Sequence, residues 1–123
     1  HEQLDEIIDY CLRSGIDGIV AGNTTRSREG LTTISKERIE EIGNGGMSGA
    51  PVHKKNLELV RYVHTRSEGK LPIIGVGGIM SPEDAQAMID AGASLVEIYS
   101  GFIYEGPALI KNINKYLETN LKK

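Results

Sequence analysis

The sequence is poor in residue types that mark several classes of protein. Its 123 residues include no tryptophan, one phenylalanine and one cysteine, Cys11. A single cysteine cannot form an internal disulfide, which fits a reducing compartment and predicts a cytoplasmic protein. Cys11 also falls on an apolar helical stripe, so we expect it to pack in the core.

Long apolar runs and an excess of basic charge are also missing. No apolar stretch approaches the ~18 residues that a membrane helix needs, and the first residues lack the basic-then-apolar order of a signal peptide. The 17 acidic residues slightly outnumber the 14 basic ones, giving a net charge of -3. Nothing here provides a broad cationic surface for nucleic acid, and no Cys, His or carboxylate spacing is typical of a metal site. We therefore expect neither a nucleic-acid partner nor a bound metal.

Helices and short apolar strands alternate along the chain. Helical spacing of apolar residues and end signals predict helices over residues 4–15, 54–67, 81–92 and 107–121. Short apolar runs predict strands over residues 16–21, 72–76 and 95–99. Residues 26–48 are polar and rich in glycine, which predicts a long loop in which residues 36–42 could supply a helical turn. Loops of this length in compact domains are usually functional or mobile.

This order of elements predicts the α/β class. Strands that are joined through helices must run parallel, and parallel strands need covering on both faces, which suits a run such as "PIIGV". Three strands make an incomplete sheet, and the chain starts directly in a helix. We therefore expect residues 1–123 to be a single partial domain, the C-terminal part of a TIM (β/α)8 barrel with three parallel strands and flanking helices. Ligands of that fold bind beyond the carboxyl ends of the strands.

Glycine turns follow the last two predicted strands. Gly77 and Gly78 close one strand, and Tyr99, Ser100 and Gly101 close the next. A phosphate accepts hydrogen bonds from consecutive backbone N–H groups, and glycine lets the backbone approach it without a Cβ in the way. The two turns therefore predict a phosphate site, although tight strand-to-helix turns would explain the glycines equally well.

Polar side chains follow the first strand as Asn23-Thr24-Thr25. Asparagine offers both a donor and an acceptor and threonine a hydroxyl, so these residues could read a planar ligand with amide and carboxylate edges. An Asx-type turn or a helix cap is the alternative. The segment "GNGGMSGAP", which holds Ser48 just before a helix, is either part of the same site or a flexible surface loop.

Four segments together carry a family resemblance: "GIVAGNTT", "GGMSGAPV", "LPIIGVGGI" and "AGASLVEIYSGFIYEGP". In this order and spacing they resemble the C-terminal half of dihydroorotate dehydrogenase, closest to the quinone-dependent (class 2) type, from about Leu4 onward. The resemblance implies an FMN-dependent barrel that oxidises dihydroorotate to orotate in pyrimidine synthesis. It also implies quinone as the electron acceptor and an intact enzyme that is peripheral to the inner membrane through an N-terminal segment not present here.

The resemblance also implies roles for particular residues. Asn23 and Thr24 resemble the pair that hydrogen-bonds orotate above the flavin. The residues that match FMN contacts or complete the phosphate turns are Gly22, Gly49, Gly77, Gly78, Tyr99, Ser100 and Gly101. Gly22 departs from the family pattern, which usually has threonine at this position, so only its backbone could serve the flavin.

The catalytic parts of the family are not matched in this sequence. The family's base, a serine in the quinone-dependent class, and its flavin-binding lysines belong to the earlier half of the barrel. We therefore assign no catalytic residue and expect a fragment that is inactive alone. Glu97 is interpreted as an inward polar residue of the barrel, and Tyr104 and Glu105 are expected in the connection to the last helix.

Two other hypotheses stay open. A different phosphate-binding TIM-barrel enzyme would use the same glycine turns but would not need Asn23 and Thr24 to face a planar base. A non-enzymatic half-barrel module could instead self-associate through the open edges of its sheet.

Overall fold

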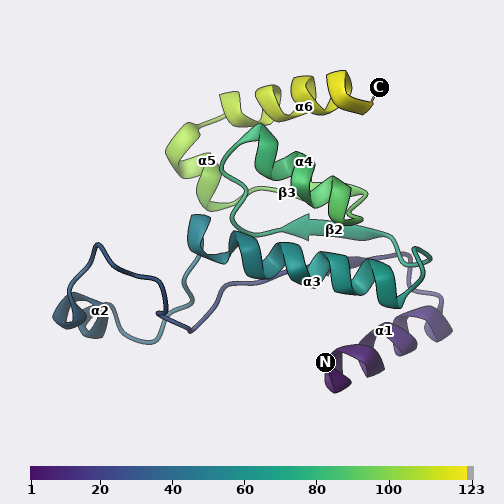
Figure 1. The fold of residues 1–123 in the computed structure, drawn as a ribbon, viewed down its shortest axis with the longest axis horizontal. Helices are drawn as coiled ribbons and strands as arrows, with labels where there is room; N and C mark the ends of the chain where they lie inside the picture. Colours follow the sequence, from purple (N-terminus) through teal and green to yellow (C-terminus); the bar gives the residue numbers. More distant parts are fainter. Residues whose placement is uncertain (122–123) are drawn as a thin grey trace.

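The computed structural model describes residues 1–121, and all the helices and strands that the sequence predicts are present (Figure 1). In chain order the elements are α1 (Glu2–Ser14), β1 (Ile19–Ala21), α2 (Lys36–Ile42), the 3-10 helix η1 (Ala50–Val52), α3 (His53–Arg66), β2 (Ile73–Val76), α4 (Pro82–Ala91), β3 (Leu95–Glu97), α5 (Ser100–Glu105) and α6 (Ala108–Leu121). None of these helices is long and apolar enough to cross a membrane.

The three strands form one parallel sheet in the order β1-β2-β3, which confirms the α/β class and leaves β1 and β3 at the edges. In register, Val20 lies beside Ile74, and Ile74 lies beside Leu95. The sequence predicted that β1 begins at Ile16, but in the structure it begins at Ile19. Its pairing with the chain before β2 starts only where the Ile19 N–H donates to the Pro72 carbonyl at 2.9 Å.

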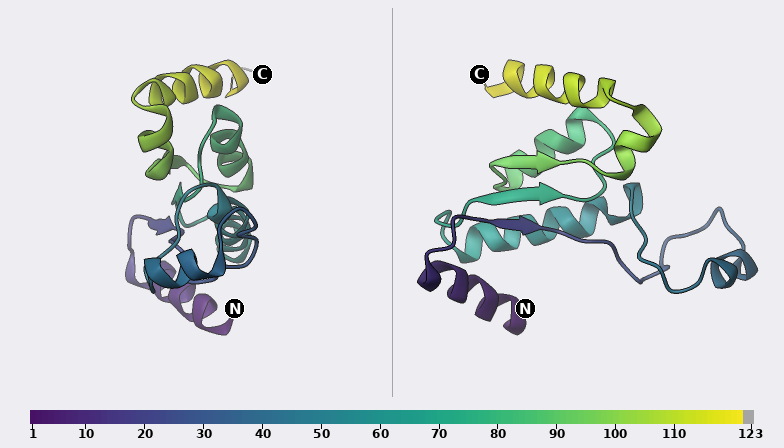
Figure 2. Two further views of the ribbon diagram at one scale, coloured as in Figure 1. Left: turned by 90° about the vertical axis from the view of Figure 1, so that its left-hand side faces the viewer. Right: turned by 180° about the vertical axis from the view of Figure 1, so that it is seen from behind.

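Helices α3 and α4 cover one face of this sheet, as Figures 1 and 2 show. Ile73 and Gly75 are buried on that face. The other face presents the row Val20, Ile74 and Leu95, and the outer two side chains are 53% and 62% exposed. The expectation of cover on both faces is therefore met on one face only within residues 1–121. In a closed barrel the open row would face the interior, where side chains pack in layers.

One apolar core lies between the covered face of the sheet and the helices. Its fully buried side chains include those of Ile8, Val60, Val63, Ile73 and Met88. Cys11 is 7% exposed and belongs to the same cluster, which confirms its packing role.

Helix α4 begins where the sequence signals predicted. The Ser81 hydroxyl accepts a hydrogen bond from the Asp84 N–H at 3.2 Å, and Pro82 occupies the first turn. The Asp84 carboxylate accepts from the N–H of Met80, the residue before the N-cap, at 3.0 Å, so one donor in the first turn and one just before the helix are satisfied.

Helix α5 was not predicted. Strand β3 ends at Glu97 rather than at Tyr99, and Ser100 begins the helix. Tyr104 and Glu105 accordingly lie in α5 and not in a connection, which corrects the sequence-based assignment. The helix has six residues and no side-chain hydrogen bond at its N-cap. A helix this short depends on tertiary packing, so the sequence carried no signal for it.

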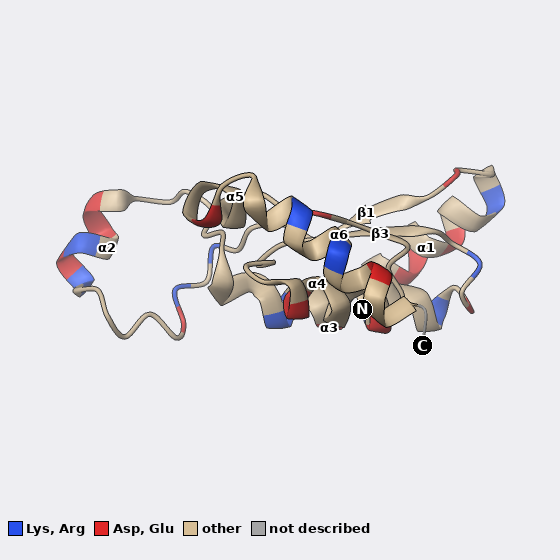
Figure 3. Cartoon of the chain, turned by 90° about the horizontal axis from the view of Figure 1, so that it is seen from above, with Lys and Arg blue, Asp and Glu red and all other residues tan. Residues whose placement is uncertain are grey.

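The segment between β1 and α3 projects away from the sheet and carries α2 at its tip (Figure 1). An antiparallel bridge closes its base, with N–H to carbonyl distances of 3.0 and 2.7 Å between Thr25 and Met47. Inside it, the Arg28 guanidinium donates to the carbonyls of Gly43 and Gly45 at 3.1 and 2.5 Å. Acidic and basic residues are interspersed along α2, as Figure 3 shows.

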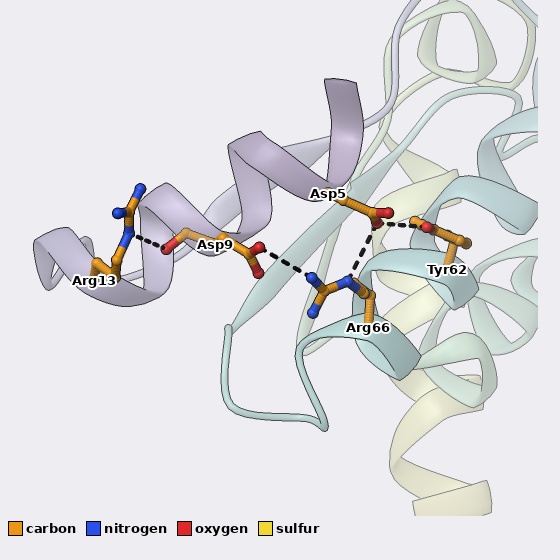
Figure 4. A network of polar contacts seen from close by, with 5 residues as sticks. All are labelled: Asp5, Asp9, Arg13, Tyr62 and Arg66. Atoms are coloured by element: carbon orange, nitrogen blue, oxygen red, sulfur yellow. Dashed lines mark hydrogen bonds and ion pairs between the residues drawn. The ribbon is translucent and has the colours of Figure 1, made fainter. Parts of the chain in front are cut away.

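A polar network joins α1 to α3 (Figure 4). Arg66 pairs with Asp9 at 3.0 Å and with Asp5 at 3.3 Å. The Tyr62 hydroxyl donates to the same Asp5 carboxylate. This hydrogen bond to a carboxylate is the main cause that raises the pKa of Tyr62 above its ordinary value.

The first prediction concerns this network. A raised pKa in the folded state stabilises the fold below the ordinary tyrosine pKa of about 10, and the stabilisation is lost as the pH rises through the folded-state pKa. We expect Tyr62→Phe to lower the melting temperature near neutral pH. The difference from the unmodified protein should shrink above about pH 10. Thermal unfolding monitored by circular dichroism measures this, with Tyr10→Phe on the exposed side of α1 as the control. A difference that stays constant into the alkaline range would contradict it.

Candidate functional site

A cavity of about 300 Å³ lies at the carboxyl ends of the three strands. It is lined by Gly22, Asn23, Thr24, Ser48, Gly49, Val52, Val76, Gly77, Gly78, Glu97, Ile98, Tyr99 and Ser100. Eight of the nine residues that the sequence predicted for the site are in this lining. The fold thus brings together segments that are up to about 80 residues apart in sequence, because parallel strands end at the same edge of a sheet.

On the β1 side, the loop backbone is held by a side chain from α3. The Asn23 N–H donates to Asn56 Oδ1 at 3.3 Å, and Asn56 Nδ2 donates to the Asn23 carbonyl at 3.0 Å. The Asn23 side-chain oxygen accepts from the Thr24 N–H at 2.8 Å, whereas the Thr25 N–H, which an Asx-type turn would use, donates to the Met47 carbonyl instead. No hydrogen bond within residues 1–121 engages Asn23 Nδ2, and the side chain is exposed. Its amide group therefore remains available to a ligand.

The turn after β2 is made by Gly77 and Gly78, whose φ angles of +111° and +75° lie in the region that favours glycine. A Cβ on Gly78 would lie 2.5 Å from the His53 Cβ and 2.6 Å from the His53 Cα and N atoms. The close approach of the start of α3 is thus sufficient reason for this glycine. The sequence suggested that glycine at position 78 makes room for a phosphate. In the structure, a side chain at this position would first meet His53.

The loop before α3 and the start of α5 meet across the cavity. The hydroxyls of Ser48 and Ser100 are 2.7 Å apart and hydrogen-bonded. Gly49 has a φ of +82°, and a Cβ there would lie 3.6 Å from the Ser100 Cβ. Ser48 was only named as part of a loop by sequence reasoning, and the structure places it in the lining.

Gly101 is the one predicted site residue that the cavity lining does not include. It is buried, and a Cβ there would lie 2.3 Å from the Ile79 carbonyl oxygen and 3.0 Å from the Leu109 side chain. Its lack of a side chain is explained by close packing between α5 and the chain that follows β2.

The cavity lining contains few charged side chains. Glu97 is its one charged residue, and no lysine or arginine among the described residues lines it. In the strand, Glu97 shares with Leu95 the open face of the sheet, as expected of an inward barrel residue. An anion at this site would therefore be held by backbone N–H groups of the glycine turns rather than by a cation from this chain.

Sequence reasoning missed Asn56. This residue is 2% exposed and shares the buried stripe of α3 with Val60 and Val63. A polar residue on an otherwise apolar helical stripe needs a hydrogen-bond partner, and that spacing could have marked it as unusual.

The comparison with protein families decides what this chain is related to. The family model described as dihydroorotate dehydrogenase matches residues 1–121. The chain belongs to the dihydroorotate dehydrogenase family. This confirms the resemblance that the four sequence segments indicated.

Individual relatives agree with the family assignment. A dihydroorotate dehydrogenase (quinone) from Christiangramia forsetii is 50% identical over 121 residues, which cover 98% of this chain and 34% of that protein. Its counterpart from Salinispora arenicola is 47% identical, with 86% of this chain and 31% of that protein covered. The crystal structure of DHODH from Eimeria tenella in complex with ferulenol superimposes with a TM-score of 0.86 at 32% identity, covering 98% of this chain and 31% of that one. The chain thus spans about a third of the length of the relatives it matches, and its three parallel strands correspond to part of a TIM barrel.

The second prediction tests the turn after β2. Gly78→Ala should destabilise the fold by about 2–5 kcal/mol, because it adds a left-handed backbone penalty and a contact with His53. The matched control is Gly30→Ala, where φ is +81° and a Cβ would meet nothing within 4 Å. Chemical denaturation of both variants measures the two free energies of unfolding. Equal stability of the two variants would show that the contact with His53 does not require glycine.

Proposed function

We propose that this chain forms part of an FMN-dependent enzyme that oxidises dihydroorotate to orotate, and that it supplies one wall of the cofactor and substrate sites. The observation that carries this proposal is the cavity at the strand ends, which gathers eight residues predicted for those two sites. Family membership of the whole described chain supports the same activity.

Asn23 and Thr24 are the proposed substrate contacts. Both side chains are exposed at the cavity, and the Asn23 backbone donates one hydrogen bond to the Asn56 side chain and accepts another from it. An amide N–H₂ group and a hydroxyl can donate to the carbonyl and carboxylate oxygens of a pyrimidine carboxylate. Their role is to orient the substrate, which is the main contribution that the protein makes in cofactor enzymes.

The glycine turns are the proposed contacts of the FMN phosphate. Gly49, Gly77 and Gly78 line the cavity with positive φ angles, and Tyr99 and Ser100 line it at the start of α5. Such backbones present N–H groups toward one point and fit an anion. The hydrogen bond between Ser48 and Ser100 holds two of these segments together. When bound, the flavin supplies the two-electron redox chemistry.

No catalytic base is assigned to these residues. The chain spans about a third of the length of its relatives, and we propose that the proton acceptor and the flavin-binding cations come from other parts of the enzyme. Quinone is the proposed electron acceptor, and a position at the inner membrane surface would place the enzyme beside it.

The third prediction addresses substrate binding. In the intact enzyme, Asn23→Ala should weaken orotate binding by about tenfold while FMN stays bound, because a ligand group loses its hydrogen-bond donor. Orotate titration and the flavin absorbance measure the two effects separately. Asn44→Ala, in the projecting segment, is the matched control. Loss of flavin with unchanged orotate affinity would reverse the assignment, and failure of the unmodified enzyme to bind orotate would favour another phosphate-binding barrel enzyme.

The fourth prediction concerns residues 1–123 alone. We expect no oxidation of dihydroorotate with a quinone and little bound FMN, because one wall of the pocket and the base are not in this chain. Strands β1 and β3 present unpaired edges, so we expect a dimer or larger species that buries them, or a poorly ordered monomer. Flavin absorbance, a turnover assay and sedimentation test this. A stoichiometrically yellow, active protein would mean that the site is complete within these residues.

A further inference from the structure

The carboxamide of Asn56 occupies an unusual position between two strand ends. The residue is on the buried stripe of α3 and is 2% exposed, although its side chain is polar. Its neighbours are Gly22, which follows β1, and Gly77, which follows β2. Asn56 does not itself line the cavity, so a ligand there is not its partner.

Both the oxygen and the nitrogen of the Asn56 carboxamide form hydrogen bonds with the backbone of Asn23. Asn56 accepts from the Asn23 N–H at 3.3 Å and donates to the Asn23 carbonyl at 3.0 Å. Strand β1 has already ended at Ala21, so the strand ladder no longer pairs the Asn23 backbone. The side chain therefore takes the place of a neighbouring strand and pairs two backbone groups for which no other described residue provides a hydrogen bond.

The two flanking glycines are matched to this side chain. A Cβ on Gly22 would lie 2.1 Å from Asn56 Oδ1, and a Cβ on Gly77 would lie 2.0 Å from Asn56 Nδ2. Gly77 has a φ of +111° and favours glycine for that reason as well. Gly22 is not among the glycines with positive φ, so its backbone would accept an ordinary residue. The obstacle to a side chain at position 22 is Asn56.

We propose that Asn56 is a positioning residue for the substrate contact Asn23, and that Gly22 and Asn56 form a matched pair in which the missing side chain makes room for the carboxamide. This inference rests on the proposed function, because that function identifies orotate as the ligand that Asn23 contacts. The pairing of Gly22 with Asn56 stands on the packing alone.

The first test measures ligand binding in the intact enzyme. Asn56→Ala removes both hydrogen bonds to Asn23, so orotate affinity should fall about tenfold while bound FMN stays at the level of the unmodified enzyme. Asn112→Ala, an exposed asparagine on α6, should leave both unchanged. A role of Asn56 in general stability alone would lower the melting temperature without this selective loss of orotate affinity. Unchanged orotate affinity in Asn56→Ala would therefore overturn the positioning role.

A near-isosteric variant covers the case in which Asn56→Ala does not fold. Asn56→Asp keeps the volume and the acceptor for the Asn23 N–H, but it replaces the donor with an oxygen that faces the Asn23 carbonyl. We expect a similar selective loss of orotate affinity above neutral pH, where the carboxylate is ionised. Wild-type affinity in a folded Asn56→Asp variant would also overturn the proposal.

The second test needs no ligand. Gly22→Ala alone should lower the melting temperature strongly, and Asn56→Ala alone should lower it moderately. Of the three close contacts that a Cβ at position 22 would make, the double variant keeps only the one at 3.0 Å to the Cβ of residue 56, which a small shift relieves. Adding Asn56→Ala to Gly22→Ala should therefore raise the melting temperature, which is the opposite of its effect alone. If the decrease in melting temperature of the double variant equals the sum of the decreases of the two single variants, the matched pair is overturned.

Hydrogen exchange separates this inference from the proposed function. In Asn56→Ala the Asn23 amide should exchange faster, whereas amides in β2 should keep their rates. If the unmodified enzyme fails to bind orotate, the proposed function is wrong, and the exchange rate of the Asn23 amide decides the positioning role. Unchanged exchange at Asn23 would overturn that role.

Discussion

Parallel pairing of three short strands is the constraint on which the rest of the structure depends. Hydrogen bonds between β1, β2 and β3 bring the carboxyl ends of all three to one edge of the sheet. Asn23 follows the first end, Gly77 the second and Tyr99 the third, so these residues line one cavity despite their separation in sequence. Helices α3 and α4 pack on the covered face and hold the strands in this arrangement.

Four of the thirteen residues that line the resulting site are glycines, and only one is charged. Glycine turns line the cavity, Glu97 is the one charged residue of its described lining, and buried Asn56 makes two hydrogen bonds to the loop after β1. A site of this kind depends on the accuracy of its turns, because backbone N–H groups cannot adjust as side chains do. The glycines at 22, 77 and 78 accordingly serve the packing of α3 as much as any ligand.

The open face and open edges of the sheet agree with the length of the chain relative to its family. Val20, Ile74 and Leu95 form an apolar row that nothing in residues 1–121 covers. In the relatives, this chain corresponds to about a third of the protein. A closed barrel would bury the row and pair both edges, which removes the exposed apolar area and the unpaired strand groups together.

The sequence by itself determined the α/β class, the order of the main helices and strands, and eight of the residues that line the cavity. Apolar periodicity, the Ser81-Pro82 start of α4 and the residues after each strand were sufficient, since these signals are local and parallel topology follows from them. Tertiary structure decided the start of β1, the existence of α5, the packing role of Gly101 and the contacts of Asn56. Three of these depend on a neighbour distant in sequence, namely Pro72 for β1, Ile79 for Gly101, and Gly22 and Asn23 for Asn56, and α5 depends on its packing against α6. Spacing along a chain cannot report such contacts, because they exist only after the helices have packed on the sheet.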